Sequence, residues 1–170
     1  MITAVGHDGA GIGGSNLADV SDINISGGII SAQGRNGAAG IGSATNGSIG
    51  SINISGGIIS AYSNAFSNSS GVCYYGAAIG AAYCSSFDSI NISGGTIYAN
   101  TAYDSRGTGA VAVGAGNSCN SDRTGIIRIS DGVVYAVGIG SADAIGVSDS
   151  TAKPADIVID GGSVYPKCGD

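Results

Sequence analysis

A ten-residue motif recurs five times along this chain of 170 residues. The string Ile-Asn-Ile-Ser-Gly-Gly-Ile-Ile-Ser-Ala begins at Ile23 and again at Ile52. Related strings begin at Ile90, Ile127 and Ile157, so successive starts are 29, 38, 37 and 30 residues apart. A repeat of this length is typical of solenoid architectures, and it limits the possible folds more than any other feature of the sequence.

A shorter motif alternates with the long one. It reads Ala-Gly-Ile-Gly at residues 10–13 and 39–42, and variants of it occupy residues 77–80, 111–114 and 143–146. Two motifs that alternate five times indicate one structural unit repeated along the whole chain.

The long motif predicts two short strands joined by a bend. Ile alternates with polar residues in Ile-Asn-Ile-Ser, which is the period of a half-buried strand. The Gly-Gly pair favours a tight bend, and the alternation resumes after it. With the short motif as a third strand, we predict an all-β fold: a single-stranded parallel β-solenoid of about five coils of 29–38 residues, expected to be right-handed. Residues 1–170 are expected to form a single domain.

Equivalent residues of successive coils should stack in columns about 4.8 Å apart. The two isoleucines of each Ile-x-Ile segment would then form the dry core. The two predicted core columns are Ile23, Ile52, Ile90, Ile127, Ile157 and Ile25, Ile54, Ile92, Ile129, Ile159.

The composition agrees with an all-β fold and excludes several other classes. The chain has no Glu and only one Leu, and 32 of its residues are Gly, so helical bundles and coiled coils are excluded. Its net charge is −6 and it has no basic cluster, which argues against nucleic acid and anionic lipid as partners. No segment has ~18 uninterrupted apolar residues, so we expect no membrane insertion.

One outward column changes from serine to tyrosine along the solenoid. Ser31 and Ser60 are followed at the equivalent position by Tyr98, Tyr135 and Tyr165. A row of exposed tyrosines suits a sugar face or a protein interface, so these three are candidate ligand-binding residues. The alternative is that the row packs under a neighbouring loop or domain.

Two coils carry insertions at the same corner, over residues 62–75 and 100–108. Insertions on one side of a solenoid often bind ligands, although they can also be tolerated surface loops. The candidate recognition residues at this edge are Tyr62, Tyr74, Tyr75, Tyr103 and Arg106.

The four cysteines suggest an oxidising, extracellular setting. Cys84 and Cys119 follow the short motif at nearly the same corner of adjacent coils, so we predict that they form a disulfide. Cys73 and Cys168 could pair only if the long second-coil loop drapes over the later coils. The chain has a single His and no C-x-x-C motif, so neither a zinc site nor any other metal or cofactor is expected.

An enzyme on this fold would need clustered carboxylates near a basic residue. The Asp residues are scattered, and the Asp-Asp and Gly-His-Gly signatures of polygalacturonases are absent. His7 lies in the sequence Gly-His-Asp-Gly, which resembles the Gly-His-Gly signature only weakly, and it is interpreted as a surface residue. We therefore expect no enzymatic activity, and a polysaccharide-active β-helix enzyme is the weakest of the alternatives.

The alternating I-x-I-S-G-G-x-I-x-A and G-A-G-I-G units resemble the Gly-rich β-helical repeats in large, adhesin-like surface proteins of gut Firmicutes, often described as carbohydrate-binding-domain-containing. The resemblance covers residues 2–165 and transfers no binding residues. It implies a fragment of a larger secreted protein at the bacterial cell surface, which acts as a binding or adhesion module for a host glycan or a secreted host protein such as mucin or immunoglobulin. The alternative function is a structural stalk or filament subunit, with end-to-end contacts to neighbouring coils of the parent protein.

Overall fold

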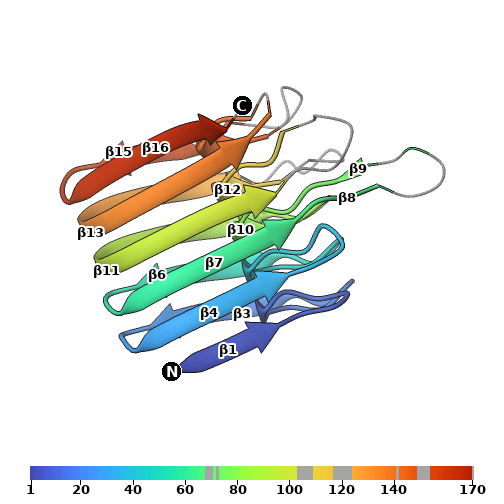
Figure 1. Cartoon of the computed structure of the whole chain (residues 1–170), viewed down its shortest axis with the longest axis horizontal. Coiled ribbons are helices and arrows are strands. Elements are labelled where there is room, and N and C mark those ends of the chain that lie inside the picture. Colours follow the sequence, from blue (N-terminus) through green and yellow to red (C-terminus); the bar gives the residue numbers. More distant parts are fainter. Residues whose placement is uncertain are drawn as a thin grey trace.

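The computed structural model describes residues 1–67, 71, 73–102, 109–116, 124–140, 142–148 and 154–169. The described chain is a parallel β-solenoid, and each coil contributes one strand to each of three faces (Figure 1). The predicted fold class is confirmed. None of the described residues forms a helix long and apolar enough to span a membrane.

The first face contains the Ile-x-Ile segments. Their strands pair in parallel and in register, so that Asn24 lies beside Asn53, which lies beside Asn91. The strands of this face are β3 (Val20–Ile25), β6 (Ile49–Ile54), the first part of β11 (Phe87–Ala102), the first part of β13 (Thr124–Ile139) and β15 (Asp156–Ile159).

The second face contains the segments that follow the Gly-Gly bend. Here Ser31 aligns with Ser60, and Tyr98 aligns with Tyr135 and Tyr165, as the repeat predicts. The strands are β1 (Ile2–Val5), β4 (Ile29–Gly34), β7 (Ile58–Asn64), the second parts of β11 and β13, and β16 (Ser163–Gly169).

The third face contains the Ala-x-Ile-Gly motifs in very short strands. Its apolar side chains form a third inward column that packs against the core. The strands are β2 (Ile12–Gly13), β5 (Ile41–Gly42), β10 (Ile79–Ala81), β12 (Val113–Ala115) and β14 (Ile145–Val147).

The coil is right-handed. In Figure 1 the near strands β1, β4 and β7 point to the right, β3 and β6 return on the far side, and successive coils climb from the N-terminus toward the C-terminus. Parallel crossover connections favour this hand, because it matches the right-handed twist of the strands.

The Gly-Gly bends behave differently in different coils. In the first two coils the bend separates two strands, and Gly28 has a φ of 93°, in the region that side chains with a Cβ rarely adopt. In β11 and β13 the strand continues through the bend with a shift in register between Ser93 and Thr96. The predicted pairs of short strands are thus single bent strands in these two coils.

The core is confirmed, and it is open at its C-terminal end. Ile52, Ile90 and Ile127 are fully buried. In the last coil the equivalent Ile157 is 45% exposed and Ile159 is 52% exposed, because no strand lies beyond them among the described residues. Phe87, which the repeat did not nominate, is the largest side chain in this core.

Asparagine side chains form a ladder on the outside of the first face. The Asn53 amide donates to Asn24 over 2.9 Å, and the Asn91 amide donates to Asn53 over 2.9 Å. Arg128 continues the row and forms an ion pair with Asp160 in the last coil. These bonds run along the solenoid axis and tie successive coils together.

Candidate ligand-binding surfaces

The predicted tyrosine row is a ladder of stacked rings, called the tyrosine ladder below. The ring centroids of Tyr98 and Tyr135 are 5.1 Å apart with an interplanar angle of 5°. Those of Tyr135 and Tyr165 are 5.0 Å apart with an angle of 13°. The three side chains are 40%, 38% and 54% exposed, so the ladder is accessible to a partner.

The stacking decides which parts of the rings a ligand can reach. Nearly parallel rings with centres this close cannot lie side by side in one plane, because their carbon atoms would overlap, so their faces must overlap. Tyr135 therefore has both ring faces covered. Tyr98 has a ring neighbour on one side only and Ser60 on the other, and Tyr165 has a ring neighbour on one side only. Ring edges and hydroxyl groups are what the middle of the ladder presents.

The ladder lies beside an exposed apolar strip on the same sheet. Ile29 and Ile58 are each about half exposed and pair with each other across β4 and β7. Ser31 and Ser60 occupy the positions at which the later coils carry tyrosine. The surface is therefore lower beside Tyr98, on the side of Ser60. This flat, partly apolar and partly hydroxylated surface is called the ladder face below.

Within the insertion at residues 62–75, β8 (Phe66–Ser67) pairs with β9 (Cys73–Tyr74) as a small antiparallel hairpin. Tyr74 packs between Phe66, at 5.8 Å between ring centroids, and Tyr83, at 4.6 Å and 65°. Both predicted edge residues Tyr62 and Tyr74 are half-buried. The hairpin projects from one side of the solenoid, as Figure 1 shows.

Tyr75 is a correction to the predicted recognition residues. Its side chain is only 2% exposed, so its ring belongs to the interior and not to the accessible edge. The two remaining edge candidates, Tyr103 and Arg106, lie outside the described residues.

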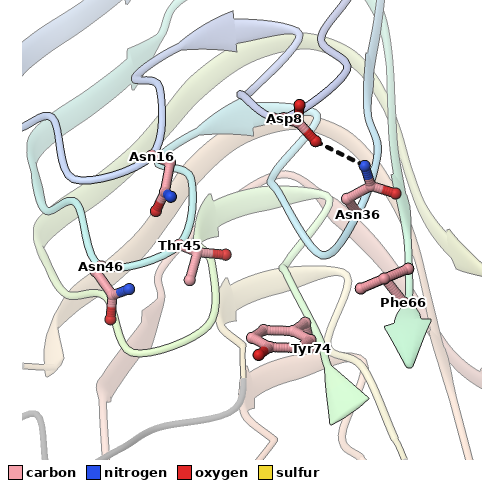
Figure 2. Close-up of a pocket in the computed structure, with 7 residues that line it drawn as sticks. All are labelled: Asp8, Asn16, Asn36, Thr45, Asn46, Phe66 and Tyr74. Atoms are coloured by element: carbon pink, nitrogen blue, oxygen red, sulfur yellow. Dashed lines mark hydrogen bonds between the residues drawn. The ribbon is translucent and has the colours of Figure 1, made fainter. Parts of the chain in front are cut away.

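A pocket of about 390 Å³, called the corner pocket below, opens beneath the hairpin against the first two coils (Figure 2). Phe66 and Tyr74 line it from the hairpin, and Asp8 and Asn36 line it from the corners that precede β2 and β5. Of these residues, only Tyr74 is a binding candidate predicted from the sequence. Asp8 and Asn36 could have been paired from the repeat, because both follow the second-face strand at the same distance, but their proximity to the hairpin could not.

The cysteine predictions are only partly addressed by the described residues. Cys84 follows β10 in a left-handed conformation with a φ of 53°, and its predicted partner Cys119 lies outside the described residues, so this pairing stays a prediction. Cys73 and Cys168 are not bonded to each other: the Cys73 thiol is 3.7 Å from the Gly71 carbonyl oxygen, and the Cys168 thiol is 3.6 Å from that of Ala142.

Within the described residues, no group of three or more His, Cys, Asp or Glu side chains is arranged to hold a metal ion. His7 is an exposed residue of the first coil, as interpreted from the sequence.

The C-terminal end exposes an apolar hollow of about 410 Å³. It contains inward-facing residues of the last coil, among them Ile145, Ile157 and Val164. Pro166 also lines it, in the inward column that Ala136 occupies one coil earlier. On this face the N–H of Thr96 donates back to Gly57 of the preceding coil. N–H groups point alternately to the two sides of a strand, and position 166 lies three residues after the equivalent of Thr96 in the last coil. The missing N–H of Pro166 is therefore on the side of the open edge. Pro166 therefore blocks that edge without removing a bond to β13.

Comparison with known proteins agrees with this architecture. The family model of the beta helix repeat matches residues 1–16, 23–47 and 52–83. No curated protein and no solved structure matches the chain. The matched segments lie in the first half of the chain, and together with the observed topology they support a β-helical repeat architecture.

Proposed function

We propose that this β-helical repeat is an extracellular binding module of a bacterial surface protein, and that its ladder face recognises a host glycan or a secreted host protein. Mucins and immunoglobulins are partners of the expected kind. The resemblance of the repeats to adhesin-like surface proteins supports the location, and the net charge of −6 favours partners other than nucleic acid.

The observation that carries the proposal is the exposure of the tyrosine ladder beside Ile29 and Ile58. Proteins rarely expose a continuous patch of aromatic and aliphatic side chains unless something binds there. Tyr is enriched at protein interfaces because it combines a rigid apolar ring with a hydroxyl group. The stacked rings hold each other in place, so a partner meets side chains that lose little rotamer freedom on binding.

The surface step at Tyr98 offers the best place for a sugar ring on this face. Its open ring face looks toward Ser60, where the small side chain leaves room for a ligand. Tyr135, whose faces are both covered, would contribute its ring edge and hydroxyl group instead.

The test is a binding screen of the oxidised protein against host glycans, mucins and secreted host proteins, immunoglobulins included. A Tyr98→Ser/Tyr135→Ser variant is compared with the wild-type protein, because serine is the residue at the equivalent positions 31 and 60. An Asn24→Ser variant, exposed on the first face, is the control. We expect a hit that the tyrosine variant loses and the control keeps.

The other outcomes separate the hypotheses. A hit that the tyrosine variant retains would leave the binding module standing and move its site to the insertion edge. The absence of any hit from folded, monomeric protein would favour the structural alternative.

That alternative, a stalk or filament subunit, is favoured by the exposed inward residues Ile157 and Ile159 at the C-terminal end. A further β-coil could stack there as the coils stack on one another, although Pro166 weakens pairing along β16. Light scattering over a range of protein concentrations tests it. Growth of the mass with concentration, abolished by Ile159→Lys, would support end-to-end assembly, and a constant monomer mass would exclude it for this chain alone.

A further inference from the structure

The corner pocket combines side chains from two coils and from the hairpin. Asp8 and Asn36 lie at the corner where the second face turns into the third, and Asn16 and Asn46 lie at the corner beyond the third face. The β8–β9 hairpin contributes the aromatic side. In Figure 2 the polar side chains and the Tyr74 ring surround a common opening.

The polar side of the pocket is held in a defined arrangement. The Asn36 amide donates to the Asp8 carboxylate over 2.8 Å, which fixes the two planar groups relative to each other. Asn36 and Asn46 have φ values of 55° and 60°, in the left-handed region that Asn tolerates better than other side chains. The backbone thus sets the direction in which each side chain leaves the main chain.

The aromatic side is held by ring contacts. Tyr83 packs edge to face with Tyr74, and the ring of Phe66 also contacts Tyr74. Figure 2 places Tyr74 across the opening from the Asp8–Asn36 pair, with Phe66 and Thr45 between them on opposite sides. A ligand in the pocket would therefore meet amide and carboxylate groups on one side and a ring on the other.

We propose that the corner pocket binds a neutral sugar, of one or two rings. Adjacent hydroxyl groups of a sugar both donate and accept hydrogen bonds. Asn side chains can both donate to them and accept from them, and the Asp8 carboxylate can accept from them. The C–H face of a sugar ring is apolar and packs on an aromatic ring. The volume of about 390 Å³ lies near the lower end of small-molecule sites, which run from roughly 300 to 1,000 Å³.

Charge narrows the ligand class. None of the described residues that line the pocket is Lys or Arg, and Asp8 brings a negative charge to it, so an anionic sugar would meet repulsion without a counter-charge. A single carboxylate paired with an amide is also a weak site for a cation, because a bound cation needs more charged oxygen ligands. This inference rests on the proposed binding function and assigns it a second, separate site.

The test is saturation-transfer NMR with free sugars as probes: galactose, N-acetylgalactosamine, N-acetylglucosamine, fucose and mannose, with sialic acid as the anionic comparison. At least one neutral sugar should give transfer at about 10 mM or below, as expected for affinities in the millimolar range. Sialic acid should give less. Absence of transfer from every neutral sugar overturns the proposal.

The variants locate the site. Asn16→Ala removes an exposed amide, and Asn46→Gly removes another while keeping a residue that adopts a positive φ. Each should weaken sugar binding about tenfold, equivalent to about 1.4 kcal/mol. Asn24→Ala, an asparagine exposed on the first face, is the matched control and should bind normally.

The two proposals fail in different ways. If the pocket variants bind sugar normally and the tyrosine variant does not, the pocket assignment is wrong and the ladder face is the sugar site. If no neutral sugar binds but a host protein does, the pocket proposal is wrong and the binding module stands. If neither kind of ligand binds, both proposals are wrong.

Discussion

Gly42 lies so close to Gly80 of the next coil that a Cβ atom on Gly42 would be 1.8 Å from the Gly80 carbonyl oxygen. The same relationship repeats along the third face, where the equivalent glycines also have φ values between 131° and 143°. In all but the last coil, where the Cβ position of Gly146 has nothing nearer than 3.8 Å, this glycine is thus required both by its backbone conformation and by the spacing of the coils.

Gly42→Ala should therefore destabilise the solenoid severely, by more than the ~1–2 kcal/mol that a left-handed conformation alone costs a residue with a Cβ. Gly27→Ala is the matched control, since nothing lies within 4 Å of its Cβ position and its φ is not positive. The free energy of unfolding in urea should be unchanged or slightly raised for Gly27→Ala. Comparable losses in both variants would show that the third-face spacing is not what selects glycine.

The tyrosine ladder should contribute to stability unequally along its length. Tyr135 makes two ring contacts and Tyr98 makes one. Each stacked pair contributes about 0.5–1.5 kcal/mol. Because Tyr135→Ser removes one pair more than Tyr98→Ser, it should lower the free energy of unfolding by about 0.5–1.5 kcal/mol more. Urea unfolding of the two variants measures the difference, and equal losses would mean that the rings do not stack in solution.

Because the C-terminal end of the core is open, two isoleucines at equivalent positions should contribute differently to the free energy of unfolding. Ile90→Ala removes a fully buried side chain and should cost about 2–5 kcal/mol. Ile157→Ala, in the same column but 45% exposed, should cost about 1 kcal/mol. If thermal or urea unfolding gives equal costs, something covers that end in solution.

The predicted Cys84–Cys119 disulfide should appear as one linked peptide when the unreduced protein is digested and mapped by mass spectrometry. Cys84→Ser should then lower stability by about 2–4 kcal/mol under oxidising conditions. Cys168→Ser, at an exposed cysteine, is the control and should have little effect. Separate alkylation of Cys84 and Cys119 in the unreduced protein would refute the pairing.

The repeat predicted the fold well because each column carries the same information several times. The isoleucines of Ile-x-Ile occur in five coils, so their register, their burial and the position of the tyrosine ladder could all be inferred from alternation alone. Burial failed only for Ile157 and Ile159, because exposure at the last coil depends on what lies beyond it and not on the motif.

The site was harder to predict because its geometry is set by non-repeating contacts. Tyr75 was expected at the accessible edge, and its burial follows from how the insertion returns to the third face, which no column specifies. The stacking of Tyr135 on both neighbours was also not predicted, and it leaves Tyr98 and Tyr165, at the ends of the ladder, as the rings with a neighbour on one side only. The corner pocket escaped prediction because the hairpin brings Phe66 near Asp8 across two coils.

The most direct test of the central proposal is quantitative binding of the strongest partner from the screen to the wild-type protein and to the Tyr98→Ser/Tyr135→Ser variant, side by side. Both proteins must first give the same circular dichroism spectrum and the same monomer mass. We predict that the variant binds at least about tenfold more weakly, a loss of about 1.4 kcal/mol. Equal affinity of the two proteins would contradict the assignment of recognition to the ladder face.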